Sequence, residues 1–284
     1  MKIKLAIIAI VSAFSISAQA ATIGSTAGIK AEILPSGNFD TGASEGGLGL
    51  SFLDKEWVNW GTHSSWSWLS SSLTGSVNTL GSNPLGSTIL ASDGSSFVLN
   101  GFFGGLTFIQ TMTLNNLNQL GVTVSMTNNT GKDITGVNWG VGLDPDVNKN
   151  YVGPLNTFDT FNTILGQDTD AAVSAFGYGQ TLTLANTTTA SAIDIAAYIN
   201  AGDCCSPVDP AVAGALPHQV LGFNTNHDDS ISLAYDIGTI GVGKTVSFGY
   251  SYTMAAVPEP ETYAMLLAGL GLMGFVARRK GKQV

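Results

Sequence analysis

The chain has 284 residues and a formal net charge of −9, with 44% hydrophobic and 11% charged residues. With only 11 basic residues it has few of the positive charges that a phosphate backbone requires, which disfavours nucleic acid as a partner. Glycine is abundant, and Ser, Thr and Asn fill most polar positions. This composition favours short strands with polar turns over helices.

Residues 1–20 have the three parts of a secretory signal peptide. Lys2 and Lys4 form a basic start, residues 5–16 are apolar apart from two serines, and Ala18-Gln19-Ala20 supplies the small residues that signal peptidase requires. We therefore expect cleavage after Ala20 and export of the chain. A permanent transmembrane helix is the competing interpretation, and the short apolar run disfavours it.

The body between the two termini, residues 21–256, is more acidic than the whole chain. Removing the six basic residues of the termini and Glu259 and Glu261 from the totals of 11 and 20 leaves 5 basic and 18 acidic residues, a net charge of −13. Anionic lipid surfaces are therefore disfavoured. The acidity either keeps the protein soluble during export or provides carboxylates that hold a divalent cation. The body is long enough to form a single all-β domain.

Residues 22–50 and 70–96 are rich in Gly, Ser, Thr and Asn, and we expect them to be long surface connections. Between them lie the four tryptophans Trp57, Trp60, Trp66 and Trp68. Aromatic faces can stack on sugar rings, with Glu56, Asn59 and His63 supplying hydrogen bonds, so the cluster could contact a glycan. The alternatives are core filling, because tryptophan buries a large area, and a partner-protein surface.

Period-two alternation of apolar and polar or small residues predicts strands over residues 106–114, 122–127 and 137–143. We expect these strands to form an antiparallel meander. Each of them has one apolar face, which requires a facing layer. The predicted fold class is therefore all-β, a two-sheet antiparallel β-sandwich flanked by the signal peptide and a C-terminal hydrophobic segment.

Four oxygen-bearing side chains follow the third of these strands at alternate positions, Asp144, Asp146, Asn148 and Asn150. Calcium favours oxygen ligands, so one interpretation is a calcium-stabilised loop with Asp159 as a distant ligand. The segment is not an EF-hand, because Lys149 and Leu155 stand where glycine and glutamate would be needed. Asp and Asn also dominate turns for local reasons, and a plain turn is the alternative.

Residues 190–201 show near-helical spacing after Ser191, which predicts one short helix. Cys204 and Cys205, the only cysteines, follow it. Export to an oxidising compartment permits a vicinal disulfide that stiffens the loop, and free thiols or intermolecular bridges are the alternatives. The pair alone is a weak zinc site, because zinc thiolates are usually two to four residues apart.

Residues 231–237 and 246–254 alternate in the same way on either side of the turn at 241–244. The segment from Asp228 to Tyr252, and Asp144-Pro145-Asp146, resemble parts of uncharacterised exported bacterial β-sandwich proteins. This resemblance supports the predicted fold and implies no activity.

Residues 257–284 form a tail with three parts. Val257-Pro258-Glu259-Pro260 precedes an apolar run from Tyr263 to Ala277, and Arg278-Arg279-Lys280 follows it. The run is shorter than the roughly 20 residues of a comfortable membrane span, and its glycines weaken a helix. The basic cluster would hold the C-terminus on the cytoplasmic side. This tail resembles the PEP-CTERM sorting signal of Gram-negative bacteria.

The resemblance implies a transient inner-membrane anchor, processing by the membrane enzyme exosortase, and delivery to the cell surface or extracellular matrix, often in strains that make exopolysaccharide. An ordinary C-terminal tail anchor is the alternative. The expected partners are signal peptidase, an exosortase-like enzyme and exopolysaccharide. Calcium is the one cofactor for which the sequence offers candidate ligands.

The sequence contains no nucleophile elbow, phosphate loop, dinucleotide fingerprint or His-Glu-x-x-His motif. We therefore expect a non-catalytic surface or matrix protein associated with exopolysaccharide or biofilm. A glycan-binding adhesive module is the first alternative, and it depends on the tryptophan cluster. A glycan-active hydrolase is the second alternative, and it requires two converging carboxylates.

Overall fold

The computed structural model describes residues 20–39, 49–58, 64–73, 75–147, 158–189, 192–215, 218–257, 267–270 and 272–273. The named elements in these ranges are almost all strands, and they form three antiparallel sheets. The exceptions are the 3-10 helix η1 (Asp168–Asp170) and the single turn and a half of α1 (Pro210–Ala215). The predicted all-β fold class is confirmed. The predicted signal peptide lies outside the described residues, apart from Ala20.

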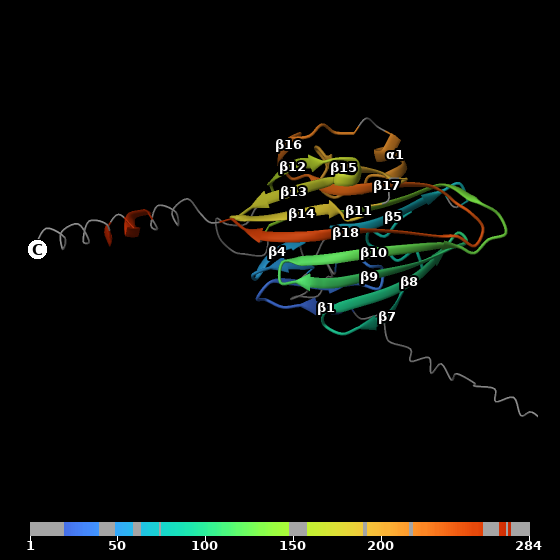
Figure 1. The fold of residues 1–284 in the computed structure, drawn as a ribbon, viewed down its shortest axis with the longest axis horizontal. Coiled ribbons are helices and arrows are strands. Elements are labelled where there is room, and N and C mark those ends of the chain that lie inside the picture. The colour runs from blue at the N-terminus through green and yellow to red at the C-terminus, as the bar shows by residue number, and fades with distance from the viewer. Residues whose placement is uncertain are drawn as a thin grey trace, which may run out of the picture.

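The larger layer is a nine-stranded sheet whose long strands run side by side in Figure 1. Its order is β16 (Asn224–His227), β12 (Thr160–Gly166), β13 (Ala172–Gly177), β14 (Gln180–Asn186), β18 (Thr245–Ala256), β10 (Gln119–Asn128), β9 (Leu106–Asn116), β8 (Ser96–Phe103) and β7 (Thr88–Ser92). The central position therefore belongs to β18, the last strand before the tail.

The second layer is a five-stranded sheet, and a smaller sheet completes the body. The five strands are β15 (Asp194–Asn200), β17 (Ser230–Ile240), β11 (Ile134–Leu143), β5 (Ser65–Ser71) and β6 (Gly75–Asn78). The smaller sheet contains β1 (Ala21–Gly24), β2 (Ile29–Ile33), β3 (Leu50–Phe52) and β4 (Lys55–Val58).

Aromatic side chains join the two larger sheets. Trp139 of β11 is fully buried, with its ring centroid 5.7 Å from that of Phe108 on β9 and 6.2 Å from that of Phe248 on β18. Tyr235 of β17 lies 4.8 Å from Phe248, centroid to centroid. Because β11 and β17 belong to one sheet and β9 and β18 to the other, these contacts establish the face-to-face packing of a sandwich.

The expected meander is wrong in its third strand. β9 and β10 pair as predicted, but β11 crosses to the other sheet and pairs with β5 and β17. The two strands near the C-terminus, β17 and β18, likewise lie in opposite sheets. Alternation identifies which face of a strand is buried, and both sheets bury such a face, so the pattern does not assign a strand to a sheet.

Three expectations for the less regular segments are also wrong. Residues 22–50 and 70–96 contain strands, and Ile29, Ala31 and Ile33 of β2 are fully buried. Residues 194–200 form β15 rather than a helix, with Ile195 and Ile199 buried and paired to β17. Pairing with neighbouring strands decides whether such a short segment forms a strand or a helix. A few apolar residues among small polar ones fit both the period of a strand and that of a helix.

Candidate functional site

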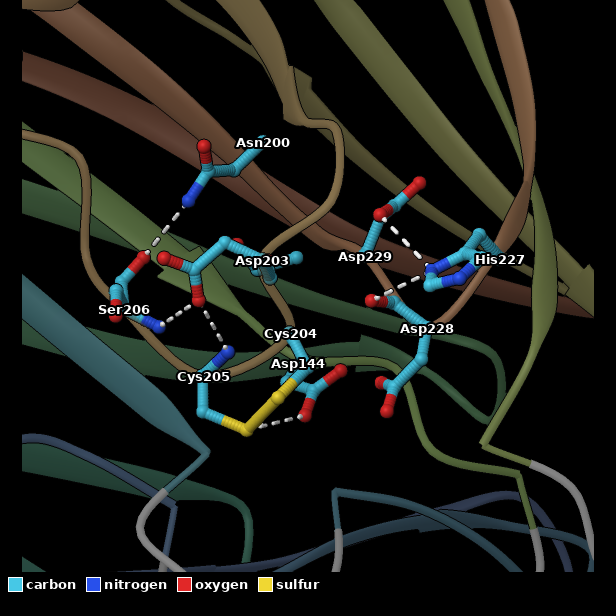
Figure 2. Close-up of a disulfide and its surroundings, with 10 residues drawn as sticks. Asp144, Asn200, Asp203, Cys204, Cys205, Ser206, His227, Asp228 and Asp229 are labelled. Carbon is cyan, nitrogen blue, oxygen red and sulfur yellow. Dashed lines mark hydrogen bonds and ion pairs between the residues drawn. A yellow bond between two sulfur atoms is a disulfide. The ribbon is translucent and has the colours of Figure 1, made fainter.

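Three loops converge at one end of the five-stranded sheet because of its strand register. Leu143, the last residue of β11, pairs with Ile231 near the start of β17, and Ile199 of β15 pairs with the same residue. The chain after β11, after β15 and before β17 therefore meets at this end. These loops, with His227 at the end of β16, carry Asp144, Asp146, Asp203, Cys204, Cys205, Asp228 and Asp229, most of which are drawn in Figure 2.

Three carboxylates form the centre of this end, which we call the acidic cluster: Asp144, Asp146 and Asp228. One carboxylate oxygen of each lies within 4.8 Å of those of the other two. Asp144 and Asp146 are only 2% and 3% exposed, and Asp228 is half-buried. The backbone fixes their loop, since the Asp144 N–H donates to the Ser64 carbonyl at 2.8 Å. Several carboxylate oxygens this close together are a donor set that suits a hard divalent cation.

The acidic cluster differs from the expected calcium ladder. Asn148 and Asn150 lie outside the described residues. Asp144 and Asp146 are brought together as expected, but the third carboxylate of the group is Asp228 rather than Asp159. Sequence reasoning missed Asp228 because 82 positions separate it from Asp146, and only the pairing of β11 with β17 brings the two together.

Asp229 ties two of the loops to each other. Its side chain is 1% exposed, and its Oδ1 accepts a hydrogen bond of 2.7 Å from the Gly202 N–H. The same oxygen lies 3.5 Å from Nδ1 of His227, while Oδ2 is buried without a hydrogen-bond partner (Figure 2). Asp229 therefore anchors the loop of residues 201–206 to the start of β17.

Cys204 and Cys205 are joined by a disulfide in the structure, and the described residues contain no free cysteine. Oδ1 of Asp203 accepts hydrogen bonds from the backbone N–H groups of Cys205 and Ser206, each at 3.2 Å. Sγ of Cys205 lies 3.6 Å from Oδ2 of Asp144, as Figure 2 shows. A disulfide sulfur carries no hydrogen, so this contact is packing, and the disulfide covers one side of the acidic cluster.

Two of the four tryptophans are buried and take no part in the glycan platform that the sequence could support. Trp57 is fully buried and donates a hydrogen bond of 3.0 Å to Oε1 of Gln180, and Trp66 is 2% exposed. Trp68 is half-buried and donates to Oγ of Ser76, and Trp60 lies outside the described residues. Glycan contact is therefore wrong for Trp57 and Trp66, because Trp57 packs in the core and the ring of Trp66 is buried against Gly142.

A second group of metal-ligand side chains escaped the sequence analysis. His218 lies between two carboxylates, with Nδ1 at 3.5 Å from Oδ1 of Asp168 and Nε2 at 3.8 Å from Oδ1 of Asp194. Both aspartates are exposed. The three residues are scattered along the chain without a motif, so no sequence signal could have found them.

The tail matches a known family. Residues 256–280 match the PEP-CTERM protein-sorting motif. The chain carries a PEP-CTERM sorting signal. The match begins at the last residue of β18 and ends at Lys280, so the signal adjoins the central strand of the sandwich without an intervening domain. Such a signal implies export and a membrane-associated sorting step at the C-terminus.

The described part of the tail is small. Pro258, Glu259, Pro260 and the basic residues Arg278, Arg279 and Lys280 lie outside it. In the parts of the chain that the structure describes, no helix is both long enough and apolar enough to cross a bilayer.

The body shows only distant likeness to known structures. A GalM/aldose epimerase homologue from C. elegans is 11% identical, with a TM-score of 0.46, and the match covers 85% of this chain and 100% of that one. The polysaccharide lyase BACCELL_00875 is 14% identical over 74% of this chain and 30% of its own, with a TM-score of 0.42. The heparan sulfate lyase HepC from Pedobacter heparinus is 8% identical over 61% and 22%, with a TM-score of 0.35. No curated protein matches the sequence.

Proposed function

We propose that this chain is an exported, non-catalytic surface or matrix protein of a Gram-negative bacterium, and that an exosortase-like enzyme cuts its PEP-CTERM tail. The observation that carries the proposal is the position of the sorting motif at the end of β18. The Val257 N–H donates a hydrogen bond of 2.7 Å to the Gly179 carbonyl, which fixes the chain up to the motif. Cleavage at Pro258-Glu259-Pro260 would therefore leave every strand of the sandwich in place.

The non-catalytic assignment draws support from the burial of two carboxylates in the acidic cluster. A glycoside hydrolase needs two carboxyl groups that flank the bond of a bound sugar. In the acidic cluster, Asp144 and Asp146 are 2% and 3% exposed, so a sugar chain has no access to them. Their burial favours a structural role for the acidic cluster over hydrolysis.

We also propose that calcium occupies the acidic cluster outside the cell. Asp144, Asp146 and Asp228 would hold the ion, because their oxygens converge within 4.8 Å and come from two separate loops. The ion would supply a positive charge that offsets the mutual repulsion of three carboxylates. Its role would be to lock the loops after β11 and before β17 together.

Exopolysaccharide contact is a second candidate function, and one surface feature favours it. An open groove on the outer face of the nine-stranded sheet is lined by uncharged residues, of which Thr123, Thr187, Thr189 and Ser247 are exposed and Thr188, Phe248 and Gly249 are buried. Gly249 forms the floor of this groove. The Gly249 N–H donates a hydrogen bond of 2.8 Å to the Thr188 hydroxyl, which donates one of 3.2 Å to the Gly249 carbonyl, and these two bonds hold Thr188 in place. Neutral sugar hydroxyls can exchange hydrogen bonds with such a lining.

Intact-mass measurement of the protein from the native cell surface tests the main proposal. The surface form should lack residues 263–284, because cutting near Pro258-Glu259-Pro260 removes the apolar run. A strain without its exosortase should retain the full C-terminus, and so should a variant with Pro258, Glu259 and Pro260 all changed to Ala. Recovery of the full-length C-terminus from the surface of the normal strain would show that the tail is only an anchor.

A further inference from the structure

Several large apolar side chains stand exposed at one end of the body. They lie on five different segments and are between 40% and 57% exposed. We call them the apolar rim: Leu53, Leu117, Phe158, Phe161 and Phe176. Single exposed apolar residues need no explanation, but aromatic and aliphatic groups gathered at one end indicate an interaction surface.

Strand register places the phenylalanines beside the exit of the tail. Phe161 of β12 pairs with Phe176 of β13, which pairs with Thr181 of β14, which in turn pairs with Ala255 of β18. These residues form one row across four strands, two positions before Val257. Phe158 precedes β12 at the same end of the sheet. Figure 1 shows β18 and β13 ending on the side where the chain leaves the body.

The two leucines belong to turns at this same end. Leu117 lies in the turn between β9 and β10, whose residue Gln119 pairs with Thr253 of β18. The Leu117 carbonyl accepts a hydrogen bond of 2.6 Å from the Ile29 N–H. Leu53 lies in the turn between β3 and β4, and its N–H donates to the Gly28 carbonyl at 3.1 Å. Residues 28 and 29 therefore connect the two turns.

The charges at this end do not form a basic patch. Asp54 and Lys55 stand next to Leu53, and Nζ of Lys55 donates to the Tyr178 carbonyl at 3.1 Å. Asp159, next to Phe158, is also exposed at this end and Asp228 is half-buried, whereas Asp144 and Asp146 are buried. An attraction to anionic headgroups therefore has no support here, and apolar contact is what the rim offers.

The tail limits how far this end can move from a membrane. Only the five residues from Pro258 to Thr262 separate Val257 from the apolar run that begins at Tyr263. An extended chain covers at most about 3.6 Å per residue, so this linkage spans roughly 20 Å. While the apolar run is held in a bilayer, the apolar rim must stay within about that distance of the lipid interface.

We propose that the apolar rim docks on the uncharged interfacial region of the phospholipid bilayer before the tail is cut. This inference rests on the proposed sorting function, because the uncut tail supplies the tether. Phenylalanine and leucine side chains lower their free energy by leaving water for the acyl boundary. Docking would hold Pro258-Glu259-Pro260 at the membrane surface, where a membrane enzyme can reach it, and cutting would release the body.

Spin labels on the uncut, full-length protein in phosphatidylcholine vesicles test this proposal. Labels are attached at Phe176→Cys or Leu117→Cys, and as a control at Val242→Cys, which is 49% exposed in the turn between β17 and β18 at the opposite end. Relaxation by oxygen should exceed relaxation by a water-soluble nickel complex at the rim, and the reverse should hold at Val242. Rim labels as accessible to nickel as the Val242 label would overturn the proposal, as would failure of the chain to float with the vesicles.

Charge substitutions give a second measurement. The double variant Phe161→Glu/Phe176→Glu should move the Leu117 label into water. The control is Phe102→Glu/Val242→Glu, which changes two exposed residues far from the tail and should leave the Leu117 label in the lipid. If the rim labels become inaccessible to the nickel complex only as the protein dimerises, the rim is a contact surface for a second copy of the chain. That result would overturn the proposal. If the rim substitutions abolish processing in cells but leave the accessibility of the Leu117 label unchanged, the rim is a contact surface for the enzyme. That result would also overturn the proposal. The vesicles contain no exosortase, so failure of cleavage in cells leaves this test unaffected.

Discussion

At the scale of single residues, the acidic cluster brings three carboxylates together, two of them in a buried position. Carboxylates that share a site repel one another, and burial weakens the screening that water provides. Asp144 and Asp146 are nearly inaccessible, and one oxygen of each lies within 4.8 Å of an oxygen of Asp228. A protein exported to a calcium-containing exterior can offset this cost with an ion, which a cytoplasmic protein would find scarce.

Calcium should therefore raise the melting temperature. At a hundred-fold excess over its dissociation constant the ion contributes about 2.7 kcal/mol, which corresponds to roughly 5–10 °C for a body of this size. Magnesium should do much less, because it demands a smaller octahedral cage. Equal melting curves in calcium and in chelator would remove the claim.

Substitution of one ligand provides the matched comparison. Asp144→Asn should lose most of the calcium shift, because a neutral amide oxygen binds calcium less strongly than a carboxylate oxygen. Asp170→Asn, in the exposed η1, should keep the full shift. Differential scanning calorimetry of both variants with calcium and with chelator makes the comparison. Equal calcium shifts in the two variants would place the ion elsewhere.

Two of the three carboxylates in the acidic cluster could be predicted from the sequence. Asp144 and Asp146 carry a local signal, because alternate oxygen-bearing residues directly after a strand are visible without a structure. Asp228 carries none, since its approach depends on the register of Leu143 with Ile231. The tryptophans show the opposite error, because a dense aromatic segment suggests a surface for sugars, whereas Trp57 belongs to the core and Trp66 is buried against Gly142.

At the scale of elements, β11 presents two different faces. Trp139 points into the sandwich, and on the other face Gly140 and Gly142 leave room for covering groups. A Cβ on Gly142 would lie 2.7 Å from the ring of Trp66, and one on Gly140 would lie 3.3 Å from Pro210 of α1. The two glycines therefore let Trp66 and α1 lie directly against the sheet, which is why Trp66 is buried.

Gly142→Ala should destabilise the protein. The added methyl group would push Trp66 away from the sheet, and overpacking of this kind costs about 1–3 kcal/mol. Gly131→Ala is the matched control, because an added Cβ there meets no atom within 4 Å. Urea unfolding should show a lower midpoint for the first variant and an almost unchanged one for the second. Similar midpoints would mean that Trp66 moves aside at little cost.

The positions of the strands were more predictable than the way in which the strands pair. Residues 106–114, 122–127, 137–143, 231–237 and 246–254 all fall within strands, because each has a regular apolar face. The crossing of β11 to the second sheet was not predictable, since both sheets bury such faces. β15 was mistaken for a helix because Ala196 is covered by Ala213 of α1 and Ala197 by the core, so both of its faces are apolar.

At the scale of the whole molecule, three tyrosines lie in the apolar space between the sheets. Tyr235, Tyr250 and Tyr252 are at most 3% exposed, and the ring of Tyr252 meets Phe39 at 5.1 Å. Burial raises the pKa of all three phenols, and the negative charge of an ionised Tyr250 would raise the pKa of Tyr235 and of Tyr252 further. The neutral phenol is therefore a condition for keeping the two layers together.

The sandwich should consequently lose stability in alkali. The phenols of the unfolded chain release their protons as the pH passes about 10, whereas the buried phenols keep theirs, so the native state binds more protons there. The free energy of unfolding should be unaffected by these groups below about pH 10 and should fall steadily above it. Melting followed by circular dichroism, together with the ultraviolet absorption of tyrosinate, measures both events. Tyr252→Phe should reduce the fall, and Tyr198→Phe, on the partly exposed side of β15, should change it less. Tyrosinate that appears for all three residues before any loss of β structure would contradict the argument, because it would mean that the packed layers tolerate the charge.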